Sequence, residues 1–116
     1  MTMKLHCFGE SGNAYKAALT LALADQEWEP VNVDFFNGAT RTPEFRALNV
    51  MGEVPVLEDG DLVLTQSGVI QDYISSKSGK LGGKSAAERR EVLRWMFFDN
   101  HKVSGVAGML RFQMNF

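Results

Sequence analysis

The first 35 residues constrain the fold most, because they switch from strand-like to helical periodicity and back again. Residues 4–8 read as a short strand, and residues 13–25 place small and apolar side chains at helical spacing. Residues 30–35 alternate like a second strand. A strand, a helix and a strand in this order form a right-handed crossover with two parallel strands. The chain therefore begins as an α/β protein.

The middle of the chain adds an antiparallel hairpin to this crossover. Thr42 and Pro43 fit the N-cap and the first turn of a short helix. Residues 54–57 and 62–64 read as strands around an Asp-Gly pair, which is a strong hairpin signal. Ser67 is then expected to cap a further helix. The predicted order is β-α-β-α-β-β-α.

Residues 78–84 separate this unit from a region of different character. They are rich in glycine and lack periodicity, which is typical of a linker. Ser85 and Glu88 fit a capping box that opens a helix. We expect residues 1–77 to form one domain, and residues 85–116 to form one long helix and the start of another.

Composition and charge exclude several classes of function. The 12 basic and 14 acidic residues give a net charge of −2, so the chain lacks the basic surface that nucleic-acid binding needs. No apolar run approaches the roughly 18 residues of a membrane span, so we expect no membrane partner. The single cysteine, Cys7, excludes an intrachain disulfide and suits a reducing cytoplasm. Neither His6 nor His101 has metal-ligand spacing around it, and no metal is predicted.

Pro55 stands inside a strand-like run, where a proline costs a ladder hydrogen bond. A cis Val54–Pro55 bond would turn the backbone groups of Val54 outward, where they could pair with an extended, peptide-like ligand. A trans proline on an edge strand is the alternative, and the low frequency of cis bonds favours it.

Two helix starts carry further candidate binding groups. At Gln66 and Ser67, unpaired N–H groups, the helix dipole and a hydroxyl could bind a carboxylate, although Ser67 could equally be a plain cap. Ser11 and Asn13 follow the first strand, where a hydroxyl and an amide could hydrogen-bond a thiolate and lower its pKa. The alternative is that one of them is an ordinary N-cap.

Together these segments resemble a known family. Residues 49–60, Asn-Val-Met-Gly-Glu-Val-Pro-Val-Leu-Glu-Asp-Gly, and the Gln-Ser helix start resemble the glutathione-binding half of cytosolic glutathione S-transferases. The resemblance spans nearly all of residues 4–77 and implies a thioredoxin-like domain with a cis proline at the position of Pro55. It also implies a set of glutathione contacts: the backbone of Val54 with the cysteinyl unit, Gln66 and Ser67 with the γ-glutamyl end, and Glu53 close to the tripeptide.

The loop Ser-Gly-Asn-Ala-Tyr-Lys at residues 11–16 resembles the Ser/Thr-x-Asn-x-x-Lys pattern of bacterial members of the family. This match implies that Ser11, assisted by Asn13, stabilises the glutathione thiolate. Tyr15 and Cys7 rank lower, because the spacing of Tyr15 suits the core and Cys7 lies mid-strand. Glutathione would be a co-substrate, and its thiolate would attack a small electrophile or exchange with a disulfide.

The resemblance implies a cytoplasmic glutathione transferase with a role in detoxification, and it makes residues 85–116 the incomplete beginning of an all-helical second domain. Residues 95–98, Trp-Met-Phe-Phe, cover more than half of a helix circumference with apolar side chains. We therefore expect a homodimer that associates through residues 92–116. Two alternatives are a non-catalytic, dimerising glutathione-binding or interaction domain and a glutathione-dependent thiol-disulfide reductase.

Overall fold

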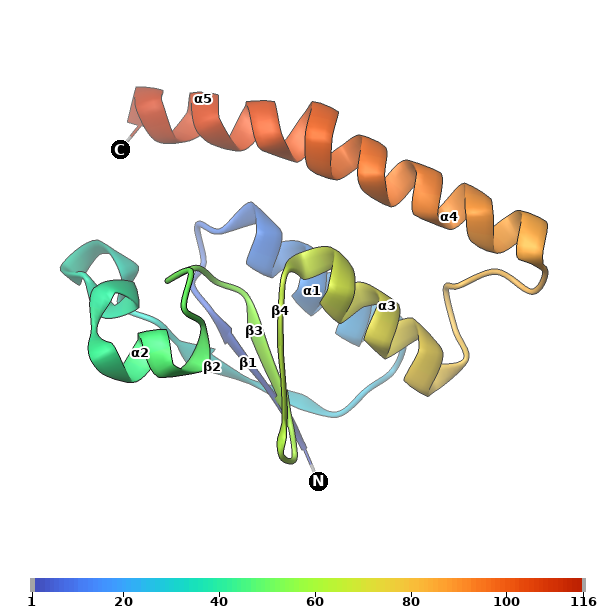
Figure 1. The fold of residues 1–116 in the computed structure, drawn as a ribbon, viewed down its shortest axis with the longest axis horizontal. Helices are drawn as coiled ribbons and strands as arrows, with labels where there is room; N and C mark the ends of the chain where they lie inside the picture. The colour runs from blue at the N-terminus through green and yellow to red at the C-terminus, as the bar shows by residue number, and fades with distance from the viewer. Residues whose placement is uncertain (1, 116) are drawn as a thin grey trace.

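One mixed sheet organises residues 2–115, which are the residues that the computed structural model describes (Figure 1). Its strands are β1 (Met3–Cys7), β2 (Trp28–Asn32), β3 (Val56–Asp59) and β4 (Leu62–Thr65), in the order β2-β1-β3-β4. β1 is parallel to β2 and antiparallel to β3, and β3 is antiparallel to β4. The predicted crossover and the predicted hairpin are both present.

Helices cover both faces of this sheet. α1 (Gly12–Leu23) and α3 (Ser67–Ser78) lie side by side on one face, and α2 (Pro43–Leu48) lies on the other (Figure 1). Two short 3₁₀ turns, η1 (Phe35–Asn37) and η2 (Ala39–Arg41), connect β2 to α2. The order β-α-β-α-β-β-α is confirmed.

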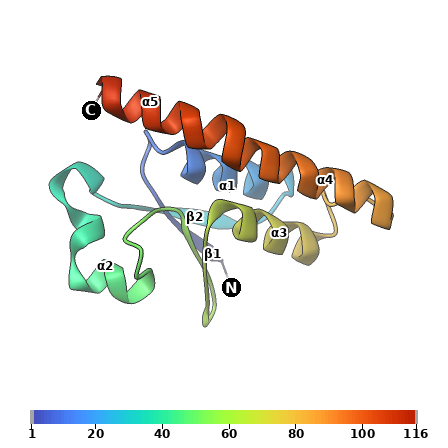
Figure 2. The same cartoon turned by 45° about the horizontal axis from the view of Figure 1, so that its top comes forward.

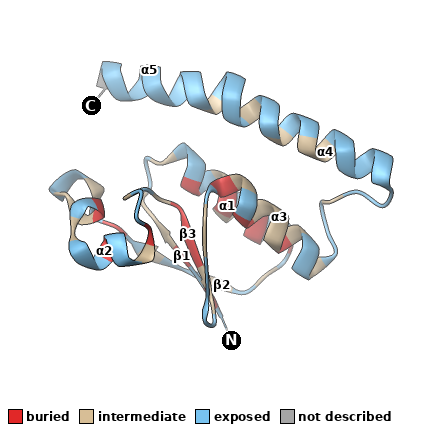
Figure 3. Ribbon diagram, in the orientation of Figure 1, coloured by how far each residue is buried: buried red, intermediate tan, exposed pale blue. Residues whose placement is uncertain are grey.

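Alternation along the strands divides the core between the two faces. Leu5 and Leu57 are fully buried against Leu21 of α1 and against Ile70 and Ile74 of α3. On the opposite face, a smaller cluster forms from Val33, Phe45 and Val56. Neighbouring strand residues point to opposite faces, so Val56 and Leu57 serve different clusters. The buried residues accordingly lie in the sheet and on the helix sides that face it (Figure 3).

The C-terminal residues form one continuous helical rod. α4 (Ala86–Phe98) runs into a π-helical turn, η3 (Asp99–Ser104), and α5 (Gly105–Asn115) continues from it. The rod passes over α1 and α3 (Figure 2). The predicted long helix and the predicted second helix are therefore joined without a loop. None of the helices within residues 2–115 is long and apolar enough to cross a membrane.

Several element boundaries differ from the prediction. β1 spans residues 3–7 where 4–8 was predicted, and α1 spans residues 12–23 where 13–25 was predicted. β2 ends at Asn32, because the chain turns into η1 soon afterwards. β3 begins at Val56, after a cis Val54–Pro55 bond and a proline that has no N–H to pair. The expectation that Ser67 caps α3 is wrong. Gln66 holds the N-cap position with a φ of 73°, and Ser67 is the first residue inside the helix.

A charged cluster ties α3 to the hairpin. Lys77 Nζ lies 2.6 Å from an oxygen of Asp59, and the Tyr73 hydroxyl also donates to this carboxylate, whose side chain is only 11% exposed. The hydrogen bond from Lys77, assisted by the one from Tyr73, holds the pKa of Asp59 below its usual range. The ionised carboxylate therefore stabilises the fold above its unfolded-state pKa of about 4, and this contribution is lost as the pH falls through the lower folded-state pKa.

We expect Asp59→Asn to lower the free energy of unfolding at pH 7 by on the order of 1 kcal/mol. Lys77 and Tyr73 lose a charged acceptor, and solvent around the partly exposed Lys77 limits the effect. The difference from wild type should be smaller at about pH 3, below the unfolded-state pKa of about 4, because protonation of the carboxyl then favours the unfolded state of the wild-type chain. Urea unfolding at both pH values measures this.

Asp25→Asn is the matched control, because Asp25 also accepts from a lysine, Lys80, at 2.7 Å but is 78% exposed. Its loss at pH 7 is expected to be smaller. An Asp59→Asn penalty that stays the same at pH 3 and pH 7 would contradict this account.

Candidate functional site

The strand ends that carry the predicted site residues meet at one edge of the sheet. Cys7 at the end of β1 pairs with Asn32 at the end of β2, and His6 pairs with Val56 at the start of β3. Val56 in turn pairs with Thr65 at the end of β4. The segments that follow β1, β2 and β4 therefore converge with the segment that precedes β3.

A cavity of about 590 Å³ opens between this edge and the C-terminal rod. The loop after β1, the turn η1 and the loop before β3 form its floor and sides. Helix α5 and the end of η3 form its roof. The predicted site residues among its lining are Ser11, Asn13, Glu53 and Val54.

Ser11 is the N-cap of α1, so the ordinary-cap interpretation describes its backbone position correctly. Its Oγ accepts a hydrogen bond from the N–H of Ala14 at 3.1 Å. That bond uses one lone pair of the hydroxyl and leaves its proton available to a further acceptor in the cavity. Asn13 is the second residue of α1, is exposed and lines the same cavity.

The loop before β3 is pinned by a residue that sequence reasoning did not single out. Asn49 is buried, and its amide donates to the carbonyl of Glu53 at 2.8 Å. Its side-chain oxygen also accepts from the N–H of Met51 at 3.1 Å. Asn49 thus fixes the loop in which Glu53 and Val54 border the cavity. Pro55, the next residue, is buried and does not line the cavity.

Gln66 and Ser67 lie outside the lining of the cavity, at the adjoining part of the same edge. They follow the last β3–β4 pair, Val56 with Thr65, so they lie beside Val54 and Pro55, which precede it. Gln66 is exposed, whereas Ser67 is buried at the first turn of α3. The predicted residues therefore form two adjoining groups, which an extended ligand could span.

An aromatic wall, which was not predicted to belong to the site, faces the rod. The Phe8 and Phe35 rings stack with centroids 4.6 Å apart, and Phe36 meets Phe8 edge-on. Phe112 of α5 meets Phe35 edge-on at 6.3 Å. The adjacent Phe35 and Phe36 of η1 were the available signal, but Phe112 is 77 positions from Phe35 in the sequence.

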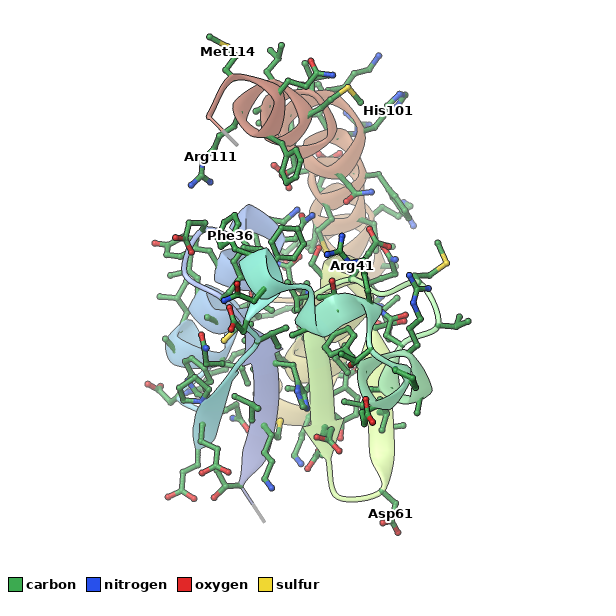
Figure 4. All side chains as sticks on the ribbon, turned by 90° about the vertical axis from the view of Figure 1, so that its left-hand side faces the viewer. Phe36, Arg41, Asp61, His101, Arg111 and Met114 are labelled. Carbon is green, nitrogen blue, oxygen red and sulfur yellow. The ribbon has the colours of Figure 1, made fainter. Side chains whose placement is uncertain are left out.

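Two basic side chains bridge the floor and the rod. Arg111 of α5 donates to the backbone carbonyl of Glu10 at 2.9 Å, and Figure 4 shows it pointing from the rod toward the part of the molecule that carries Phe36. Lys16 of α1 donates to Asp99 at 2.7 Å and to Ser104 at 3.2 Å. The Lys16 hydrogen bond also lowers the pKa of Asp99, and burial partly opposes that shift.

The lower-ranked candidates have other surroundings. Tyr15 is 65% exposed, so the expectation that its spacing places it in the core is wrong: α1 turns this position away from the sheet. Cys7 is the last residue of β1, so the expectation that it lies mid-strand is wrong. It is half-buried, and desolvation raises the pKa of its thiol. Within residues 2–115, no group of three or more histidine, cysteine or acidic residues is placed to hold a metal ion.

The comparisons with known proteins agree on one family. The model of the glutathione S-transferase N-terminal domain matches residues 1–76. Glutathione S-transferase 3 of Zea mays is 35% identical over 117 aligned positions, which cover 97% of this chain and 52% of the relative. The probable elongation factor 1-gamma 2 of Arabidopsis thaliana is 32% identical over 114 positions, which cover 96% of this chain and 27% of the relative. This chain belongs to the glutathione S-transferase family.

Solved structures give the same answer for the fold. A possible glutathione S-transferase from Rhodopseudomonas palustris is 37% identical, with a TM-score of 0.89 over 97% of this chain and 58% of that chain. A family member from Pseudomonas fluorescens with two glutathione molecules bound is 26% identical, with a TM-score of 0.91 over 99% and 53%. The sheet and its helices are thioredoxin-like, as the resemblance implied. The chain spans about half the length of the Zea mays relative.

Proposed function

We propose that this chain binds glutathione and activates its thiol for transfer to a small electrophile. The observation that carries the proposal is the meeting of Ser11 and Val54 on one cavity, with a helix N-terminus on the Ser11 side. A cysteinyl unit paired with the backbone of Val54 would then bring its sulfur toward the Ser11 hydroxyl. Membership of the family supports this placement.

Two parts of glutathione require different contacts. In the proposed pose, the backbone of Val54 pairs with the cysteinyl unit as one strand pairs with another. The γ-glutamyl carboxylate lies at Gln66 and Ser67, where the first N–H groups of α3 and its dipole favour an anion. Glu53 borders the cavity close to the tripeptide. An extended ligand in this pose follows the edge of the sheet.

The activation step uses Ser11 and Asn13. A donated hydrogen bond stabilises a thiolate more than a thiol, and the N-terminus of α1 adds a favourable dipole. The thiol loses its proton to solvent, and the sulfur then forms a bond to the electrophilic carbon. The leaving group departs with the electron pair of the bond that breaks. A disulfide would instead accept the thiolate at sulfur and release a thiolate.

A non-catalytic role is the second candidate, and the match to a probable elongation factor 1-gamma favours it. That relative is named as an elongation factor and not as a transferase, although 96% of this chain aligns with it, compared with 97% for the transferase of Zea mays. As an interaction domain, this chain would bind glutathione or keep only the fold, and it would not turn over electrophiles.

We further propose the division into a glutathione-binding domain at residues 1–77, a linker at 78–84 and the start of the family's helical domain at 85–116. Phe116 and Met1 lie outside the described residues. A cytoplasmic location would keep Cys7 and the glutathione pool reduced, which the proposed chemistry requires. A role in the detoxification of small electrophiles would follow from this activity.

Ser11→Ala is expected to lower kcat/KM for conjugation by about 10- to 100-fold, because one preorganised donor to the thiolate is lost. The pH profile of the rate should shift upward, since the thiolate then forms at a higher pH. Glutathione affinity at low pH, where the thiol stays protonated, should change little. Steady-state kinetics from pH 6 to about pH 9 and a glutathione titration measure these effects.

Ser85→Ala is the matched control, because Ser85 also caps a helix, with its Oγ 3.1 Å from the N–H of Glu88. Both variants lose a cap, but only Ser11 lines the cavity. An unchanged rate and pH profile in Ser11→Ala would remove Ser11 from the mechanism. Glutathione binding without turnover in wild type would favour the interaction domain.

We also propose that residues 92–116 mediate homodimer formation. Large apolar side chains of the rod are exposed within this range, including Trp95, Phe97, Met109 and Met114. Several such side chains on one helix form the kind of apolar surface that proteins bury in an interface.

Sedimentation of the wild-type chain at micromolar concentration should show a dimer. Phe97→Ser should shift the distribution toward monomer, because Phe97 is 71% exposed and its truncation removes apolar surface. Val63→Ser, at a 39% exposed position on β4, is the control that should leave the distribution unchanged. A wild-type chain that sediments as a monomer would contradict the proposed interface.

A further inference from the structure

Helix α5 forms the roof of the cavity, and contacts between the rod and α1 bear on its height above Ser11. One group of side chains supplies such contacts. Lys16 Nζ lies 2.7 Å from an Asp99 oxygen and 3.2 Å from Ser104 Oγ. Ser104 Oγ in turn lies 3.1 Å from both Asp99 oxygens. These three residues form the Lys16 cluster.

The Lys16 cluster is more sheltered than an ordinary surface ion pair. The side chain of Lys16 is 21% exposed and that of Asp99 is 37% exposed. By comparison, the Lys80–Asp25 pair has the same 2.7 Å separation with exposures of 49% and 78%. Partial burial reduces screening by water and salt, so the cluster constrains its two helices more strongly than a surface pair does.

The π-helical turn makes the cluster possible. Asp99 and Ser104 are five residues apart, which in an α-helix would place them about 140° apart around the axis. A π-helical turn closes a bond from residue i to residue i+5, so its two ends lie on the same face. Asp99 and Ser104 are the two ends of η3, and both therefore reach Lys16.

The surroundings of Gly105 are independent evidence that η3 is a π-helical turn. A Cβ at Gly105 would lie 3.0 Å from the backbone oxygen of Asn100, which is again five residues earlier. Such a contact is tighter than side chains normally make, so the close turn favours a residue without a Cβ. A Cβ at Gly108 would meet nothing within 4 Å. The sequence thus accommodates the turn at the point where α5 begins.

The cluster lies beside the residues that form the site. Lys16 lies in α1, five residues after the N-cap Ser11. Ser104 lines the cavity, and α5 continues from it as the roof. We propose that Lys16, Asp99 and Ser104 act as positioning residues that fix the height of α5 above the Ser11 loop, and so set the space open to the second substrate. The last part rests on the proposed glutathione chemistry.

Two measurements on the full chain separate this role from general stabilisation. Amide hydrogen exchange of residues 105–112 in the free chain should be about three- to tenfold faster in Lys16→Met than in wild type, because α5 loses its anchor. Kinetically, KM for the electrophile should rise by a similar factor of about three to ten, with a smaller change in kcat. The glutathione dissociation constant should stay within about twofold, because the binding groups of the floor are unchanged.

Lys80→Met is the matched control, since it breaks a lysine–aspartate pair with the same separation of 2.7 Å. Neither Lys80 nor Asp25 lines the cavity. Amide exchange of residues 105–112 should therefore be the same in Lys80→Met as in wild type. Lys16→Arg should restore wild-type behaviour, because it keeps the charge and the donors. Ser104→Ala, which removes only a hydroxyl, should give an intermediate effect and serves if Lys16→Met does not fold.

Unchanged exchange in both Lys16→Met and Ser104→Ala would overturn the positioning role, as would an equal increase in Lys80→Met. Faster exchange together with a weakened glutathione affinity and an unchanged electrophile KM would overturn the assignment to the second substrate. Failure of the wild-type chain to bind glutathione would count against the proposed function alone, because the exchange comparison needs no ligand.

Discussion

The pairing of β1 on both of its edges is the constraint on which the rest of the molecule depends. β1 pairs with β2 along one edge and with β3 along the other, and its central Leu5 is fully buried. This strand therefore fixes where its own exit loop lies relative to the end of β2 and the start of β3. Ser11, Phe35 and Val54 meet because each is within a few residues of a strand end held by β1.

Much of this arrangement could be predicted from local sequence. Periodicity, helix caps and the Asp-Gly turn signal predicted each strand and α-helix of residues 2–78, because these signals lie within short segments. The proline at position 55 indicated an unusual geometry, with a cis or a trans bond as the alternatives. The Val54–Pro55 bond is cis in the structure. The helix boundary at Ser67 was missed by one residue, because Gln66 adopts a backbone conformation that no sequence pattern announced.

Several of the features that sequence reasoning missed depend on contacts between residues far apart in the sequence. Phe112 joins the aromatic wall, and Arg111 and Asp99 contact α1 or the loop before it, from more than 75 positions away. The π-helical turn η3 has no simple periodic signature in the sequence. It places Asp99 and Ser104, its first and last residues, where both accept hydrogen bonds from Lys16. Asn49 belongs to the segment that resembles the family, but the sequence does not show that its side chain donates to the carbonyl of Glu53 and so holds the loop in place.

In the proposed pose, glutathione lies along the sheet edge from Ser11 past Val54 to Ser67. Titration of the isotopically labelled chain with glutathione, followed by amide chemical shifts, tests this most directly. We expect saturable shifts at residues 11–13, 53–54 and 66–67, with the hairpin tip at Gly60 and Asp61 unaffected. The absence of saturable shifts, or shifts confined to the α4 surface, would contradict the account.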